Sequence, residues 1–237
     1  MKLYTTQDRV CASRTDARGA MRLTGAMDSI QDCSMSWLES EPPFLEYLRE
    51  NNLAMFLVSR QADILRLPVF GENIRVKTWI YHASSFLGYR NTVLYGEDGL
   101  PCILTWAVGA FVNFDTGKMS RIPQAELDKI TIEDRLDMEY LDKKIVLPRV
   151  PERHLDAFRV RRSDIDINHH MNNAKYIEAA LEFLPETFTA KRLRIEYKSP
   201  AKLGDWVYPK LMEGPEGTYY VRLLNLNGDP FAVMEFS

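Results

Sequence analysis

The sequence predicts an α+β protein made of two tandem copies of one unit, in which a helix precedes several antiparallel strands. The first indication is an internal repeat, because residues 57–79 and 193–208 both read as strand, turn and strand. Each segment has a proline, a glycine and an acidic residue in the same order: Pro68, Gly71 and Glu72 in the first, and Pro200, Gly204 and Asp205 in the second.

A predicted hairpin follows in each half. Residues 89–106 hold the turn sequence EDGLP between two β-rich runs, and residues 219–236 hold NGDP in the same place. Gly and Asp or Asn between alternating apolar residues are typical of hairpin turns. Both halves therefore contain several antiparallel strands.

One helical pattern stands upstream of the strands in each half. The residues of the two stripes recur at helical spacing, and they are Leu23, Met27, Ile30, Ser34 and Trp37 in the first half and Tyr176, Ile177, Ala180, Leu181 and Leu184 in the second. We expect each helix to pack on one face of a curved antiparallel sheet. Two tandem copies would let the sheets join and bury their edges.

The domain boundary is expected between residues 131 and 150. This segment is rich in charge and ends in Leu-Pro-Arg-Val-Pro at 147–151, which is typical of a connector. The sequence therefore predicts a first domain at 1–130, a connector at 131–150 and a second domain at 151–237.

The composition is that of a folded protein without general affinity for nucleic acid. The chain has 237 residues, an apolar fraction of 46% and a formal net charge of −3. Its longest apolar run, at 103–112, is too short to span a membrane, and the opening residues lack the core of a signal peptide. We therefore expect a cytoplasmic protein with no membrane span. The cysteines at 11, 33 and 102 form no Cys-x-x-Cys pair, so neither a disulfide framework nor a zinc knuckle is expected.

Polar residues that could do chemistry are concentrated in the segment 164–176, which reads DIDINHHMNNAKY. Side chains alternate between the two faces of an extended strand. The polar residues that would share one face are Asp164, Asp166, Asn168 and His170. Asn172 or Asn173 is a good N-cap for the following helix, so the cluster would meet a helix N-terminus. The alternative is that these residues only turn and cap the chain, which is a common use of Asp and Asn.

A helix N-terminus beside such a cluster suits an oxygen that acquires negative charge, as in acyl transfer. We expect backbone amides near Asn172 and Asn173 to hold that oxyanion. The neighbouring pair His169 and His170 could also indicate a metal site. Adjacent side chains of an extended segment point to opposite faces, however, so no metal or other cofactor is expected.

The run from Asp166 to Tyr176, followed by Glu-Tyr-Lys at 196–198, resembles the second half of the bacterial-type acyl-acyl carrier protein (acyl-ACP) thioesterases. These enzymes have two tandem hotdog domains, each a long helix against a curved antiparallel sheet. They hydrolyse acyl-ACP to free fatty acid and ACP, which terminates fatty-acid synthesis. A shorter Asp-x-Asn-x-His-x-Asn-Asn pattern resembles single-domain hotdog thioesterases that act on coenzyme A (CoA) esters, but the tandem repeat favours the carrier-protein branch.

By this resemblance the catalytic residues are Asp166, Asn168 and His170. Plant members have a further Glu followed by Cys where this chain has Pro200 and Ala201. The residues that could replace this Glu are Glu178, Glu182 and Glu196, although Glu196 lies about 13 Å from Pro200 along an extended strand. Because no Cys aligns as a nucleophile, we expect Asp166 to activate water or, less simply, to attack the carbonyl itself.

The first half lacks the motif, since residues 14–22 contain neither the Asn nor the His. The resemblance implies that this half houses the acyl chain, so Met27, Ile30 and Trp37 are candidate pocket residues, with ordinary core packing as the alternative.

The resemblance also implies acylated ACP as the partner, and basic clusters at 159–162 and 191–194 could dock it unless they are merely solvated. An acyl-CoA thioesterase and a noncatalytic acyl- or ACP-binding hotdog module remain alternative functions. We expect a monomer or a homodimer.

Overall fold

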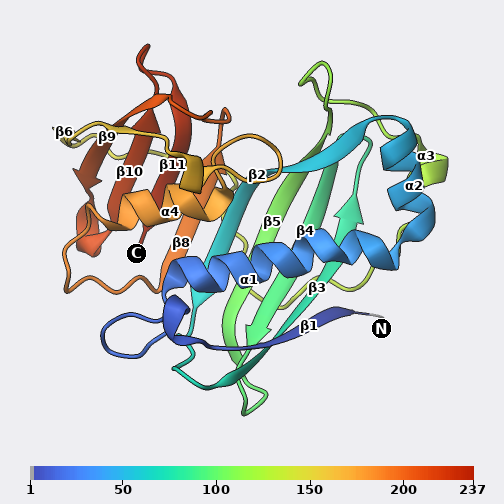
Figure 1. The fold of residues 1–237 in the computed structure, drawn as a ribbon, viewed down its shortest axis with the longest axis horizontal. Helices are drawn as coiled ribbons and strands as arrows, with labels where there is room; N and C mark the ends of the chain where they lie inside the picture. The colour runs from blue at the N-terminus through green and yellow to red at the C-terminus, as the bar shows by residue number, and fades with distance from the viewer. Residues whose placement is uncertain (1–2) are drawn as a thin grey trace. The chain divides into compact units, whose positions relative to one another are not determined.

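The computed structural model describes residues 3–237 and divides into two compact units, Met1–Leu141 (unit 1) and Asp142–Ser237 (unit 2). Each unit has an antiparallel sheet and a helix on it (Figure 1), so the predicted α+β class is confirmed. The division falls inside the segment 131–150 that the sequence assigned to a connector. The domain limits at 130 and 151 stay predictions.

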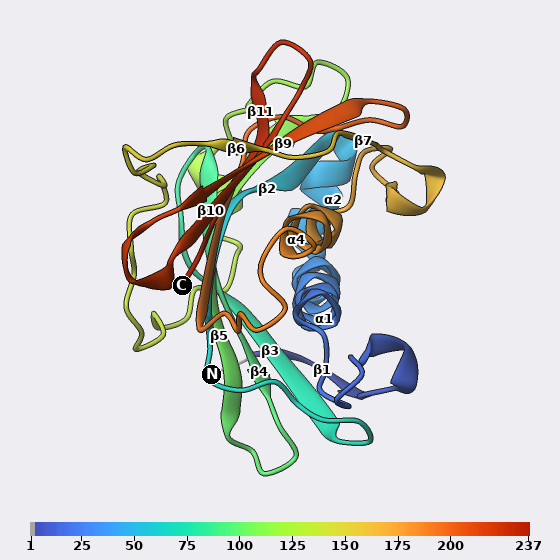
Figure 2. The same cartoon turned by 90° about the vertical axis from the view of Figure 1, so that its left-hand side faces the viewer.

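Unit 1 has its sheet in the order β1-β3-β4-β5-β2, with every neighbouring pair antiparallel. The strands are β1 (Tyr4–Arg9), β2 (Leu53–Ile64), β3 (Asn73–Ala83), β4 (Leu87–Tyr95) and β5 (Pro101–Asn113). The helices are α1 (Leu23–Ser36), α2 (Pro42–Glu50) and α3 (Gln124–Leu127), with 3-10 turns η1 (Ala12–Arg14) and η2 (Trp37–Ser40). Figure 2 shows α1 on one face of this sheet.

Unit 2 repeats the plan with its sheet in the order β8-β11-β10-β9-β6, and β7 also pairs with β9. The strands are β6 (Arg153–His154), β7 (Phe158–Arg159), β8 (Arg192–Tyr197), β9 (Trp206–Glu213), β10 (Tyr219–Leu224) and β11 (Pro230–Phe236). The helix is α4 (Asn173–Leu181), and the 3-10 turns are η3 (Arg162–Asp164) and η4 (Pro215–Gly217). Both predicted hairpins are present, as β4–β5 and β10–β11.

The apolar stripes of α1 and α4 face their sheets, as their spacing predicted. Met27 and Ile30 are 1% and 0% exposed, and Ile177 and Ala180 are 1% and 0% exposed. Full burial of an Ile or Met side chain contributes about 1.5–3 kcal/mol, so this face holds each helix in place. Two members of the predicted stripes lie beyond their α-helices. Trp37 lies in η2, after α1 ends at Ser36, and Leu184 follows the end of α4 at Leu181.

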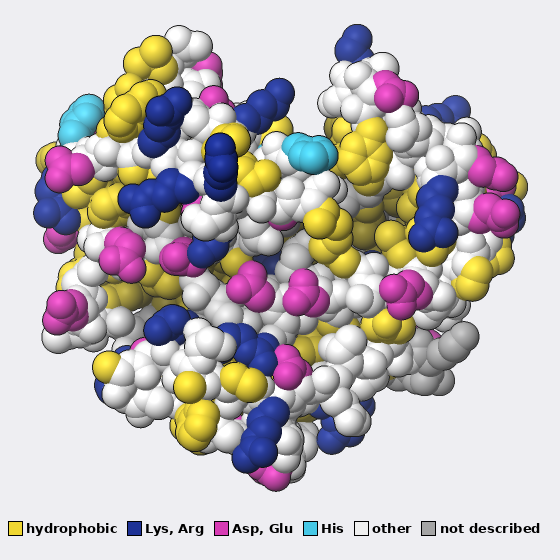
Figure 3. Space-filling model, viewed as in Figure 1, with side chains coloured by type: hydrophobic (Ala, Val, Ile, Leu, Met, Phe, Trp, Pro, Cys, Tyr) yellow, Lys and Arg dark blue, Asp and Glu magenta, His cyan; other side chains and the backbone are white. Residues whose placement is uncertain are grey.

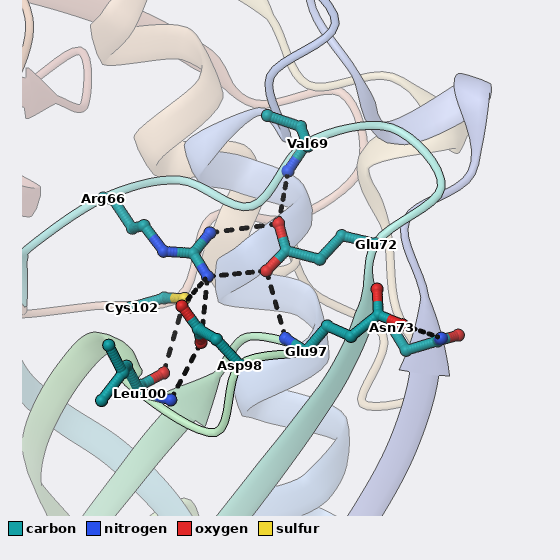
Figure 4. Close-up of polar contacts among 8 residues, drawn as sticks. All are labelled: Arg66, Val69, Glu72, Asn73, Glu97, Asp98, Leu100 and Cys102. Carbon is teal, nitrogen blue, oxygen red and sulfur yellow. Dashed lines mark hydrogen bonds and ion pairs between the residues drawn. The ribbon is translucent and has the colours of Figure 1, made fainter.

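An ion-pair cluster joins the turn before β3 to the β4–β5 hairpin (Figure 4). The Arg66 guanidinium donates to both carboxylate oxygens of Glu72, at 2.7 and 3.1 Å. The same carboxylate accepts from the amides of Val69 and Glu97, at 3.0 and 3.2 Å. These bonds hold the pKa of Glu72 at about 2, with the Arg66 side chain as the main cause.

Residues 131–141 run along unit 1 and are held by its side chains. The Trp79 indole donates to Asp134 O at 2.8 Å, and Gln61 bonds both Glu139 O and Leu141 N, at 2.8 and 3.1 Å. Gln61 is 2% exposed, so these bonds satisfy a buried amide. In residues 3–237 no helix is long and apolar enough to cross a membrane.

Candidate active site

The polar motif of unit 2 forms a tight turn and not the extended strand that the sequence predicted. Ile165 and Met171 form an isolated antiparallel bridge, and the turn lies between them. Asp166 N donates to His170 O at 3.0 Å, and His169 N donates to Asp166 O at 3.0 Å. His169 has a φ of +62°, the left-handed conformation that such a reversal requires.

The turn brings two of the three predicted catalytic side chains together. Asp166 Oδ1 lies 3.9 Å from His170 Nδ1, and the two side chains are 19% and 17% exposed. The same Oδ1 accepts a hydrogen bond from Asn168 N at 2.8 Å. The carboxylate and the imidazole therefore meet because the chain reverses, and not because side chains alternate along a strand.

Asp164, the fourth residue expected on that face, has a different role. Its Oδ2 accepts from Arg161 N at 2.7 Å, so the side chain closes η3. Its backbone oxygen accepts from Asn172 N at 2.7 Å. The prediction that Asp164 joins the cluster was wrong because the chain is not extended there.

Helix α4 begins directly after the turn, with Asn172 as the N-cap. Asn172 Oδ1 accepts from Ala174 N at 2.8 Å, which confirms one of the two predicted caps. The amide of Asn172 is engaged by Asp164, whereas no hydrogen bond from the Asn173 amide is present in the described part of the chain. Of the two amides expected to hold an oxyanion, the one at Asn173 is therefore available.

Tyr176 supports the turn from α4, a role that the spacing of the apolar stripe did not predict. Its hydroxyl accepts from Ala201 N at 2.9 Å, and Ala201 O accepts from Met171 N at 2.8 Å. Burial raises the pKa of Tyr176 to about 12, and the charge of Asp166 acts in the same direction. Tyr176 thus stays protonated at neutral pH. The sequence held one sign of this role, because a tyrosine hydroxyl at a position predicted to be buried needs a hydrogen-bond partner.

Two of the three glutamates considered as a further catalytic acid are engaged by other residues, and the third is exposed. Ala201 is 0% exposed and supplies its backbone to Met171 and Tyr176. Glu196 Oε1 accepts from Ile145 N at 2.7 Å, and its other oxygen pairs with Lys198. Glu178 pairs with Lys175 at 2.7 Å. Glu182 is exposed at the end of α4.

Neither a metal cluster nor a disulfide is found in the described residues. No group of three or more His, Cys, Asp or Glu side chains in residues 3–237 is arranged to hold a metal ion. The side chain of His169 is exposed. Cys11, Cys33 and Cys102 are free thiols, and burial raises the pKa of the latter two.

Unit 1 contains the same turn without the same side chains. Asp16 N donates to Ala20 O at 2.8 Å, and Asp16 Oδ1 accepts from Arg18 N at 2.9 Å. Gly19 stands where His169 does, with a φ of +80°. Arg18 and Ala20 therefore occupy the places of Asn168 and His170, as the absence of the motif predicted.

The three residues predicted to line an acyl pocket lie in the core of unit 1. Met27, Ile30 and Trp37 are 1%, 0% and 3% exposed. The guanidinium of Arg90 lies 4.4 Å from the centre of the Trp37 ring. Contact with substrate stays a prediction for all three.

Several plant proteins resemble this chain in sequence. The chloroplastic acyl-[acyl-carrier-protein] hydrolase FATB2 of Cuphea viscosissima is 31% identical over 162 residues, which are 63% of this chain and 39% of that protein. A palmitoyl-acyl carrier protein thioesterase of Cuphea hookeriana is 30% identical over 162 residues, covering 63% of this chain and 38% of that protein. The matched region is thus well under half the length of these curated relatives.

The fold is that of solved thioesterase structures. An acyl-ACP thioesterase from Bacteroides thetaiotaomicron superposes with a TM-score of 0.87 at 20% identity, over 99% of this chain and 96% of the other. The 12:0-ACP thioesterase of Umbellularia californica gives a TM-score of 0.83 at 14% identity, over 99% and 96%. The predicted class of two tandem hotdog units is confirmed by this likeness.

Two family models match the chain in the order that its repeat predicts. The acyl-ACP thioesterase N-terminal domain matches residues 1–130, and the acyl-ACP thioesterase C-terminal domain matches residues 148–223. The chain therefore belongs to the acyl-ACP thioesterase family.

Proposed function

We propose that this protein hydrolyses acyl-ACP thioesters to free fatty acid and ACP, and so terminates fatty-acid synthesis. The observation that carries the proposal is the pairing of Asp166 with His170, 3.9 Å apart, directly before the N-terminus of α4. Family membership and the hydrolase names of the relatives support it.

In the proposed mechanism Asp166 is the general base. It takes a proton from water, and the resulting hydroxide adds to the thioester carbonyl carbon. His170 and Asn168 orient the water and the reacting oxygen. His170 is close enough to share a water with the carboxylate, since a 3.9 Å separation leaves room for one bridging oxygen.

The oxyanion of the tetrahedral intermediate is held by the N-terminus of α4. The Asn173 amide donates to it, and the helix dipole stabilises its charge. The carbon–sulfur bond then breaks, the acid is released, and the thiolate receives the proton that Asp166 had taken. Tyr176 and Ala201 hold the turn in this position through the bonds at 2.9 and 2.8 Å.

The test is Asp166→Asn, which keeps an Oδ1 acceptor for Asn168 N and removes the base. Asp16→Asn in unit 1 is the matched control, because Asp16 makes the three corresponding backbone contacts in the equivalent turn, besides a bond from Ala20 N and an ion pair with Arg18. A positioned base contributes about 10²–10⁴-fold, so Asp166→Asn should lower thiol release from acyl-ACP by at least about 100-fold, with Asp16→Asn close to wild type. Near-normal turnover in Asp166→Asn would refute the assignment.

The same assay separates other functions. Equal or faster release from acyl-CoA would identify a CoA thioesterase, and acyl-ACP binding without thiol release would identify a noncatalytic module. The cytoplasmic location and the monomer or homodimer stay predictions, and size-exclusion chromatography with light scattering would decide the latter.

A further inference from the structure

Unit 2 has a groove that three arginines line. Its volume is about 660 Å³. The lining comprises residues 157–162, Leu203, Gly204 and Trp206. Arg159, Arg161 and Arg162 are exposed, and so are Leu203 and Trp206, at 56% and 52%. Figure 3 shows Lys and Arg side chains gathered on the face of unit 2 that carries α4.

These arginines have no acidic partner, unlike five of the basic residues of the unit. Lys175, Arg194, Lys198, Lys210 and Arg222 each form an ion pair with a glutamate. The other basic residues of unit 2 that form no ion pair in the described part of the chain are Lys143, Lys144, Arg149, Arg153, Lys191 and Lys202. No ion pair of the three groove arginines is present in residues 3–237. Three like charges within four residues repel one another, and an anion would relieve that repulsion.

One of the arginines is fixed by the backbone beneath it. Arg159 Nε donates to Gly204 O at 2.9 Å, which leaves the two terminal nitrogens of the guanidinium for another acceptor. A Cβ at Gly204 would lie 3.2 Å from Arg159 Nη2, and Gly204 has a φ of +88°, so this approach depends on glycine. Trp206 pairs with Arg159 across β9 and β7, which sets the indole beside the charge.

Unit 1 provides an internal comparison. Arg9 Nε donates to Gly71 O at 2.9 Å, so the arginine–glycine contact by itself belongs to the shared fold. Counting from the matched contacts, Cys11 and Ala12 stand where Arg161 and Arg162 do, and Asn73 stands where Trp206 does. The charge cluster and the exposed indole are therefore confined to the unit that carries the Asp-Asn-His motif.

The groove lies close to that motif along the chain. Arg162 and Asp166 are four residues apart, so their Cα atoms are separated by at most about 14 Å. On the other side of the groove, Leu203 follows closely on Ala201, whose backbone anchors the motif through Met171.

We propose that this groove binds the phosphate of the phosphopantetheine arm that carries the acyl chain on ACP. The proposal rests on the proposed function, because it names the part of the thioester that reaches this site. Arginine is suited to the task, since its planar guanidinium can donate two parallel hydrogen bonds to one phosphate. Trp206 offers an apolar surface to the uncharged portion of the arm.

The test uses three thioesters of one acyl chain, attached to ACP, to free 4′-phosphopantetheine and to pantetheine without the phosphate. The variant is Arg161→Glu with Arg162→Glu. Arg9→Glu is the control, because it reverses the charge at the shared arginine–glycine contact of unit 1. Loss of charge-assisted bonds costs about 10- to 100-fold. We expect that fall in kcat/KM for the two phosphate-bearing substrates, no change for the pantetheine thioester, and no effect of Arg9→Glu.

Two outcomes would overturn the proposal. An equal fall for the pantetheine thioester would show that the arginines do not act through the phosphate. A fall for acyl-ACP alone would show that they contact the carrier protein and not its arm. If wild type hydrolyses none of the three, the proposed function fails, and calorimetry with 4′-phosphopantetheine against pantetheine then tests the groove by itself. Binding that requires the phosphate and is lost in the double variant would sustain the proposal, and equal or absent binding would end it.

Discussion

Replacing Glu72 with Gln should destabilise the protein by about 1–2 kcal/mol at pH 7 and by progressively less below about pH 5. The carboxylate accepts four hydrogen bonds, two of them from Arg66 (Figure 4). These bonds lower its pKa from 4.5 to about 2. Gln has nearly the same size but no charge. Its NH₂ group is a donor, and it would face N–H donors from which the carboxylate oxygen accepted.

The expected loss of stability follows from the lowered pKa of Glu72 and from the solvent exposure of the Glu72 and Arg66 side chains. At about 1.4 kcal/mol per pKa unit, a fall from 4.5 to about 2 corresponds to about 3 kcal/mol before screening. The Glu72 side chain is 10% exposed but that of Arg66 is 37% exposed, so solvent screens the pair and lowers the value to about 1–2 kcal/mol. Because the folded pKa is depressed, this stability is present above pH 4.5 and is lost as the pH falls toward 2.

The assay is urea unfolding of wild type and Glu72→Gln at pH 7, 5, 4 and 3. Asp98→Asn is the control, because Asp98 contacts the same guanidinium at 3.4 Å with a side chain that is 49% exposed. It should cost less than about 0.5 kcal/mol at every pH. A Glu72→Gln deficit that stays constant from pH 7 to pH 3, or that Asp98→Asn reproduces, would refute the reasoning.

Three further substitutions test the turn, the helix cap and the sheet. His169→Gly should stabilise the protein by up to about 1 kcal/mol in urea unfolding, because the φ of +62° is strained for histidine, and turnover should stay within about twofold; a tenfold loss of turnover would give this imidazole a role. Asn172→Ala should cost about 1 kcal/mol by removing the cap on Ala174 N, while Asn172→Ser should retain most of the stability; equal stability of the two variants would contradict this. Gly109→Ala should cost about 1–3 kcal/mol in thermal unfolding, since the new Cβ would lie 2.5 Å from Met55 Cγ, and adding Met55→Ala should recover part of it; an unchanged melting temperature in the single variant would contradict the clash.

The fold was predictable because its signals are local. The stripe of α1 and the glycines of the hairpin turns each act within a few residues, and the repetition of both in the second half predicted a second unit. The end of α4 was less predictable, because Leu184 has the spacing of the stripe although the helix stops at Leu181. Periodicity alone does not show where a helix ends.

The candidate site shows the limit of reasoning from alternation. Asp166 and His170 were expected on one strand face, and they meet because Asp166 N bonds His170 O across a turn. Asp and Asn are typical turn residues, so the capping alternative described the backbone better than the strand did. The hydrogen bond from Asn172 N to Asp164 O could not be predicted from the sequence, because it depends on where the turn places the carbonyl of Asp164.

The two turns separate the contribution of the backbone from that of the side chains. Asp16 and Asp166 share three bonds to the main chain of their turns, so an aspartate at this position has a structural role whether or not any chemistry follows. The presence of Asp166 is for that reason weak support for catalysis. His170 carries more weight, because Ala20 closes the equivalent turn with the same backbone bond and no imidazole. A histidine that the turn does not require, held 3.9 Å from the carboxylate, is the feature that hydrolysis would explain.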